Sequence, residues 1–162
     1  PLWDNCLKGG MELLDFGMAD LDQVFAVEEV ATDESFTWMG ARFQIVPLVH
    51  LRGGAYLMWS YGVFVETAVG GVLLTSDCRF ERDRLDPWYA KSALIFQDCE
   101  TLPEPSGAHA HFLELSTLDA DLKARMWLYH LNCIGRPDAV AAGFRGIVEP
   151  GQSFDLGEPL RN

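Results

Sequence analysis

The sequence predicts a mixed α/β fold of the α+β type, formed by a single domain over residues 1–162. From about residue 36 to residue 75, runs of β-branched and aromatic residues are separated by glycine-containing breaks, which is typical of adjacent strands in a meander. Strands alternate with helical patterns only in the second half, so we expect a mixed sheet with flanking helices. A hydrophobic content of 49% indicates a packed core.

The first half predicts short elements followed by four strands. Residues 4–14 have a helical pattern that a pair of glycines weakens, and residues 21–25 predict a short amphipathic turn or helix. The glycine pairs at 53–54 and 70–71 are the expected turns between strands. The strands themselves are expected over residues 36–39, 43–49, 56–66 and 72–75.

The second half predicts helices between short strands. The charged run at residues 79–84 predicts a solvated loop, and Asp86-Pro87 predicts a helix start. Residues 119–125 have acids first and bases last, and Asp138 can cap a helix over residues 138–144. The strands are expected over residues 93–96, 126–129 and 146–148.

Charge and segment composition disfavour several classes of protein. The formal net charge of −12 argues against a broad grip on long DNA or RNA, which needs clustered Lys and Arg. No apolar run approaches about 18 residues and the N-terminus lacks the features of a signal peptide, so we expect a cytoplasmic protein with no membrane partner. The cysteines are widely spaced without CxxC pairs, which favours reduced, buried thiols: Cys6, Cys78, Cys99 and Cys133.

The histidines and one acid mark a candidate site. His50, His109, His111 and His130 each lie at the end of an apolar β-like run or in the loop after one, and Asp77 ends another such run. Metal hydrolases place ligands where buried strands end and solvent begins. Taken singly, these residues could be strand caps, turn formers or polar loop residues, but their joint placement favours a site.

Four segments carry a resemblance to a known family. They are Val46-Pro47-Leu48-Val49-His50, Val72-Leu73-Leu74-Thr75-Ser76-Asp77, Gly107-Ala108-His109-Ala110-His111 with Glu114 after it, and Trp127-Leu128-Tyr129-His130-Leu131. In this order and spacing the chain resembles the metallo-β-lactamase-fold hydrolases, most of all the phosphodiesterase branch that includes the transfer-RNA 3′-processing ribonuclease Z. The resemblance implies an αββα sandwich with two divalent metal ions (Zn, Mn or Fe) at the strand ends.

The resemblance also implies roles for individual residues. His50 would bind the first metal, Asp77 would bridge both metals, and His130 would bind the second. His109, in the position of the branch's Gly-His-Ser segment, would be the catalytic histidine at the leaving oxygen, with Glu114 as its support. An aspartate suits the bridge because each of its oxygens can face one cation, and imidazole suits the other positions. The implied reaction is hydrolysis of a small-molecule phosphodiester or of an RNA 3′ end.

The chain departs from the family at one motif. The defining His-x-His-x-Asp-His segment is absent from these residues, so we expect the chain to be the C-terminal portion of a longer hydrolase domain. Each metal would then have two protein ligands, whereas zinc normally has three or four. We predict weak metal binding, little or no activity of the chain alone, and association into a homo-oligomer through an uncovered sheet face.

Two other functions compete with phosphodiester hydrolysis. An acyl hydrolase, such as a thioesterase or lactonase, would also polarise its substrate with a metal, but carbonyl hydrolysis does not need His109. A non-catalytic binding or assembly module would explain the missing ligands.

Overall fold

The computed structural model describes residues 2–15, 17–32, 34–132 and 135–157, and the chain divides into two compact units, Pro1–Val30 and Ala31–Asn162. The first unit contains only short elements. They are the π-helical turn η1 (Trp3–Leu7), α1 (Lys8–Met11), the hairpin of β1 (Leu13–Leu14) and β2 (Gly17–Met18), and α2 (Leu21–Val24). The helix expected over residues 4–14 therefore ends at Met11, whereas the short helix expected near residue 21 is confirmed.

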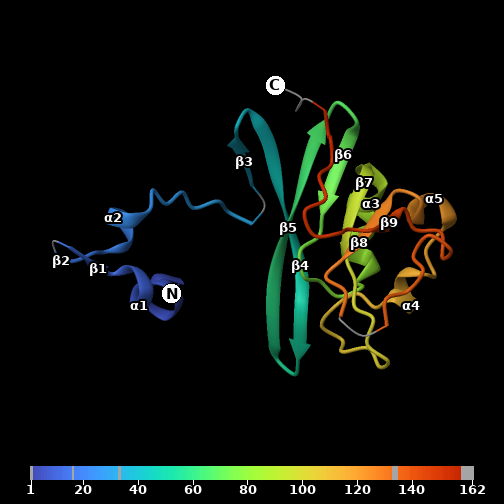
Figure 1. Cartoon of the computed structure of the whole chain (residues 1–162), viewed down its shortest axis with the longest axis horizontal. Helices are drawn as coiled ribbons and strands as arrows, with labels where there is room; N and C mark the ends of the chain where they lie inside the picture. Colours follow the sequence, from blue (N-terminus) through green and yellow to red (C-terminus); the bar gives the residue numbers. More distant parts are fainter. Residues whose placement is uncertain (1, 16, 33, 133–134, 158–162) are drawn as a thin grey trace. The chain divides into compact units, whose positions relative to one another are not determined.

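The second unit is built on a seven-stranded mixed sheet (Figure 1), which confirms the predicted fold class. Its strands, in spatial and chain order, are β3 (Ser35–Trp38), β4 (Ala41–Gly53), β5 (Tyr56–Thr67), β6 (Gly70–Leu74), β7 (Ser92–Asp98), β8 (Met126–Tyr129) and β9 (Gly146–Ile147). The strands from β3 to β6 are antiparallel, and those from β6 to β9 are parallel.

The β4–β5 hairpin is much longer than its neighbours (Figure 1). β6 pairs only with residues 63–67 of β5, so the hairpin from about residue 48 to residue 60 extends past the end of β6. His50 lies in β4 at a bulge between Val49 and Leu51. The expectation that β4 ends at His50 is wrong, because pairing continues to Gly53.

Helices connect the parallel strands, with two departures from expectation. α3 (Arg82–Lys91) lies between β6 and β7; it begins four residues before Asp86, so Pro87 lies inside it. α4 (Phe112–Leu115) and α5 (Ala120–Lys123) lie between β7 and β8. The helix expected over residues 138–144 is wrong: Asp138 caps only a turn through the Ala141 N–H, and Gly143 takes a left-handed φ of 92°.

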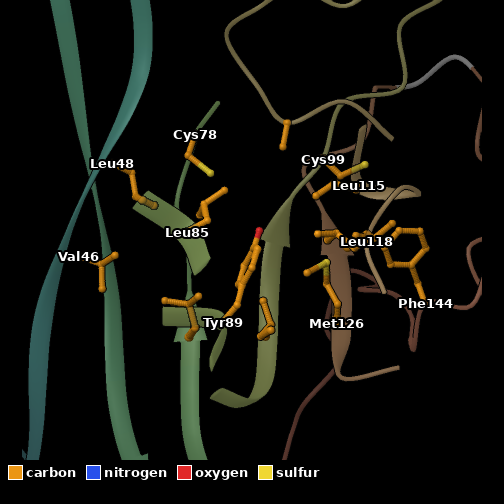
Figure 2. Packing of buried hydrophobic residues seen from close by; sticks show 14 of the residues in the cluster. Val46, Leu48, Cys78, Leu85, Tyr89, Cys99, Leu115, Leu118, Met126 and Phe144 are labelled. Carbon is orange, nitrogen blue, oxygen red and sulfur yellow. The ribbon is translucent and has the colours of Figure 1, made fainter. Parts of the chain in front are cut away.

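The main core lies on the sheet face that α3, α4 and α5 cover (Figure 2). Leu85 and Tyr89 of α3 are buried there with strand residues and with residues from the connections after β7 and β8. The strand residues include Val46, Leu48, Phe64, Leu73, Ile95, Met126 and Leu128. Each fully buried aliphatic side chain of this kind contributes about 1.5–3 kcal/mol of transfer free energy. This packing fixes the ends of the parallel strands, where the candidate site lies.

A second, smaller cluster lies on the opposite face. It contains Val65 and Val72, which alternate along their strands with Phe64 and Leu73 of the main core, and Leu156 packs against it. Within the described residues, no helix is long and apolar enough to cross a membrane.

Candidate metal and catalytic site

The candidate site lies at one edge of the sheet. Because β6, β7 and β8 are parallel, their carboxyl ends meet at this edge, where open α/β sheets bind ligands. Asp77 follows β6, Asp98 is the last residue of β7, and His130 follows β8 directly. β4 and β6 are both antiparallel to β5, so β4 brings His50 to the same edge. The loop after β7 carries His109.

Asp98 is the centre of this arrangement and is fully buried. Its Oδ2 accepts a hydrogen bond from the Cys78 backbone N–H at 2.9 Å and lies 2.8 Å from His109 Nδ1. Its Oδ1 lies 2.9 Å from His130 Nδ1. The Asp98 backbone N–H donates to Thr75 Oγ1 at 3.0 Å, which ties the end of β7 to the end of β6. One carboxylate therefore holds two imidazole rings and a backbone amide.

This geometry fixes the tautomers of two histidines. An ionised carboxylate only accepts hydrogen bonds, so His109 and His130 each donate Nδ1–H to Asp98. The Nε2 atom of each neutral ring then carries a lone pair, which is the form that a metal ligand or a proton acceptor needs. His130 Nδ1 also lies 3.3 Å from Asp77 Oδ1.

Three histidine rings lie in a row. The ring of His109 contacts the ring of His50 at a centroid distance of 4.9 Å and the ring of His130 at 4.8 Å, both edge to face. His50 Nδ1 lies 3.2 Å from the carbonyl oxygen of Ala108, which accepts its proton. His50 therefore also presents Nε2 as its free nitrogen.

The donor set fits divalent metal ions. Asp77, Asp98, His109 and His130 each offer a ligand atom, and these atoms lie within 4.8 Å of one another. Carboxylate oxygen and imidazole nitrogen are ligands that Zn²⁺, Mn²⁺ and Fe²⁺ share. Asp77 is 44% exposed and His130 is 48% exposed, whereas Asp98 is inaccessible. Asp77 and His130 thus face the open side, and Asp98 supports them from behind.

Two residues beside the site have an unusual backbone. Ser76, next to Asp77, has φ of 59°, and His130 has φ of 64°. Left-handed conformations at residues other than glycine cost of order 1–3 kcal/mol and concentrate at functional sites. The strain turns the chain sharply at the ends of β6 and β8, where Asp77 and His130 leave the sheet.

The structure places the four expected site residues together and adds one. His50, Asp77, His109 and His130 converge, as the resemblance implied, but Asp98 was expected only to follow a strand. Its signal was available, since it ends a buried apolar run in the same way as Asp77 does. Glu114 does not support His109: its Oε2 accepts the His111 backbone N–H at 3.0 Å, and Asp98 holds His109 instead.

His111 has a structural role. The Leu113 N–H donates to its Nδ1 at 3.2 Å, so its Nε2–H donates to the Leu102 carbonyl oxygen at 2.8 Å. Both ring nitrogens are occupied and the residue is buried. His111 therefore caps α4 and offers no free ring nitrogen to a metal.

The thiols near the site stay protonated. Burial raises the pKa of Cys78 and the pKa of Cys99 to about 12, which favours the neutral thiol at both positions. The prediction of reduced, buried thiols is confirmed for these two residues. It is wrong for Cys6, which is free but exposed, and Cys133 lies outside the described residues.

The fold and the site together define the class of protein. The structure matches the metallo-β-lactamase fold protein YhfI from Bacillus subtilis with a TM-score of 0.58 and 18% identity, over 76% of this chain and 53% of that one. The chain therefore has the metallo-β-lactamase fold. It belongs to the Anti-Pycsar protein Apyc1 family, whose model matches residues 1–154.

Two curated relatives agree with this family. The chain is 28% identical to the Anti-Pycsar protein Apyc1 of Paenibacillus harenae over 160 residues, which cover 96% of this chain and 61% of the relative. It is 31% identical to the protein of the same name from Paenibacillus xerothermodurans over 135 residues, which cover 80% and 50%. The chain thus spans between half and two thirds of the length of these relatives.

Proposed function

We propose that this chain supplies part of the active site of a metal-dependent phosphodiesterase that hydrolyses a small cyclic nucleotide. The observation that carries the proposal is the buried Asp98 carboxylate, which holds His109 and His130 beside Asp77. Family membership favours a cyclic nucleotide among phosphodiesters. The net charge of −12 favours a small substrate over an RNA 3′ end in a ribonuclease Z-like reaction.

The residues divide the chemistry between them. His50, Asp77 and His130 would hold two divalent cations (Zn, Mn or Fe), and Asp77 has two carboxylate oxygens to offer. When bound, such cations supply Lewis-acid activation of water and of the phosphate oxygens. Asp98 orients the imidazole rings of His109 and His130. Groups that orient a metal-binding histidine usually affect metal affinity as well as activity.

His109 is the proposed general acid. In its imidazolium form it donates Nδ1–H to Asp98 and can deliver the Nε2 proton to the departing oxygen of the phosphodiester. The Asp98 carboxylate is placed to pair with that charged ring, because its Oδ2 lies 2.8 Å from His109 Nδ1 and the carboxylate itself has no access to solvent. Hydrolysis of a thioester has less need for such an acid, since a thiolate is a better leaving group than an alkoxide.

The test is hydrolysis of 3′,5′-cyclic nucleotides with added Mn²⁺ or Zn²⁺, by the chain and by the protein from the whole reading frame that contains it. We expect the protein from the whole reading frame to release the nucleoside monophosphate, and the chain alone to release little or none. In the former protein, His109→Ala should lower kcat about 10²–10⁴-fold. Asp77→Ala should abolish turnover. Cleavage of a thioester or lactone without phosphodiester turnover would favour the acyl hydrolase, and no turnover of either substrate would favour a binding module.

A further inference from the structure

A cluster of arginines borders the candidate site. Arg52, Arg79 and Arg84 surround the single carboxylate of Glu81, with N···O distances of 3.2, 3.7 and 3.2 Å. Three guanidinium groups against one carboxylate leave an excess of positive charge, in a chain with 12 basic and 24 acidic residues. Arg52 and Arg84 of this arginine cluster line a cavity of about 650 Å³, together with Glu81, Arg82 and Asp83.

Arg79 connects the arginine cluster to the candidate site. Its backbone N–H donates to the Val49 carbonyl oxygen at 2.8 Å, next to His50. Its guanidinium Nη1 donates to the Gly107 carbonyl oxygen at 2.6 Å, while His50 binds the next carbonyl, that of Ala108. The guanidinium and the histidine thus hold adjacent peptides of the loop that carries His109. The buried Nε of Arg79 has no hydrogen-bond partner among the described residues.

An exposed indole completes the surface. Trp59 lies on the protruding part of β5, is 41% exposed, and has the Arg84 guanidinium 4.7 Å from its ring centroid. Arg52 pairs with Leu57 in the β4–β5 register, two residues from Trp59, so Arg52 and Trp59 lie on the same face of the hairpin. Indole and guanidinium planes are the groups on which nucleobases stack in nucleotide-binding proteins.

We propose that Trp59 and Arg84 form the nucleobase platform of a nucleotide subsite, and that Arg52 and Arg79 bind the anionic charge of the same ligand. The ligand class is a nucleoside cyclic monophosphate. The proposal rests on the proposed function for the position of the scissile phosphate and adds the recognition of the rest of the substrate. It also explains why a chain with a large negative charge concentrates cations beside this edge of the sheet.

The experiment is calorimetric titration with a 3′,5′-cyclic nucleoside phosphorothioate, which resists hydrolysis, and with inorganic phosphate as the base-free probe. Both the chain and the protein from the whole reading frame are titrated in the presence of Mn²⁺. We expect Trp59→Ala to weaken binding of the analogue about ten-fold, the size of one base–aromatic stacking contact, without weakening binding of phosphate. Trp59→Phe should retain most of the affinity, and Arg52→Gln should weaken both probes.

Trp38→Ala is the matched control, because Trp38 is a tryptophan of the same sheet that is 63% exposed outside the arginine cluster. Arg84→Gln provides a second variant of the platform if Trp59→Ala unfolds. Equal affinities of Trp59→Ala and Trp38→Ala for the analogue, or no binding by the wild type, would overturn the subsite. If the analogue binds in a way that depends on Trp59 but no hydrolysis occurs, the nucleotide subsite is supported and the proposed phosphodiesterase activity is refuted. If hydrolysis occurs and Trp59→Ala leaves KM unchanged, the phosphodiesterase activity is supported and the subsite is refuted.

Discussion

The substitution Asp98→Asn tests the centre of the site with the least change in shape. Asn keeps one acceptor oxygen but places an NH₂ group where the second carboxylate oxygen lies. Because the Cys78 backbone N–H donates to Oδ2, the Asn oxygen takes that position, and the NH₂ group faces His130 Nδ1, 2.9 Å from the Oδ1 position. That ring must give up its Nδ1 proton, and the neutral tautomer that remains carries its proton on Nε2. A protonated Nε2 cannot bind a metal.

The size of the effect follows from this tautomer change. Removing the partner of a metal-binding histidine typically costs about 10–100-fold in metal affinity, so we expect that loss for Zn²⁺ and for Mn²⁺. The mismatched buried hydrogen bond should also lower the free energy of unfolding by about 1–3 kcal/mol, because Asp98 has no access to water that could satisfy the lost contact.

Metal affinity is measured by competition with a chromophoric chelator, and stability by urea unfolding. Asp86→Asn is the matched control: it removes the same charge from a side chain that is 45% exposed and pairs with Arg82 on α3, where such a pair contributes about 0.3–0.5 kcal/mol. If Asp98→Asn binds Zn²⁺ as tightly as Asp86→Asn does, the assignment of Asp98 as the group that orients the ligands is refuted.

Four further predictions concern stability, reactivity and assembly. Gly62→Ala should lower the free energy of unfolding, measured by urea titration, by about 1–3 kcal/mol, because the new Cβ would lie 2.5 and 2.8 Å from backbone oxygens at the end of β6. Gly53→Ala is the control: its Cβ would meet no atom within 4 Å, so it should lower the free energy of unfolding less. Burial raises the pKa of Tyr89 well above its ordinary value of 10.0. The stabilisation from the neutral phenol is therefore complete below about pH 10 and is lost as the pH rises further. The free energy of unfolding of Tyr89→Phe should fall less between neutral and alkaline pH than that of the wild type. Iodoacetamide should modify Cys6 in the native chain and spare Cys78 until urea is added. Self-association stays a prediction, and a sedimentation coefficient independent of concentration down to the monomer value would contradict it.

The sequence predicted the sheet well because strand patterns are local. Alternation of apolar residues and paired glycines located all four strands of the meander, and the change to helical patterns located the parallel half. The errors arose where tertiary packing overrides a local signal. Pro87 suggested a helix start, but Leu85 packs fully into the core and the helix begins at Arg82. Asp138 suggested a helix cap, but Gly143 ends the segment as a set of turns.

Asp98 was missed as a member of the site for a different physical reason. Its role depends on contacts with residues 11, 20 and 32 positions further along or back in the chain, which no local pattern encodes. His50, Asp77, His109 and His130 could be predicted because each lies at the end of an apolar run or in the loop after one, and because their order matched a family. The Asp98 carboxylate, which orients His109 and His130, ends a strand of the same sheet, and the parallel pairing of β6, β7 and β8 places it between the ends of its neighbours.

The proposed reaction has two requirements, the orientation of the histidines and the binding of two cations, and different parts of the molecule meet them. The parallel strands β6, β7 and β8 fix Asp98 and the rings of His109 and His130 through protein contacts alone, and the core packing under these strand ends holds the arrangement. The position of the proposed general acid and the orientation of the proposed ligand His130 thus follow from contacts within this chain. Completing the coordination of two cations needs more ligands than His50, Asp77 and His130 provide. Orientation and proton transfer therefore depend on the parallel half of the sheet, whereas metal affinity depends on how many further ligands reach the open side of Asp77 and His130.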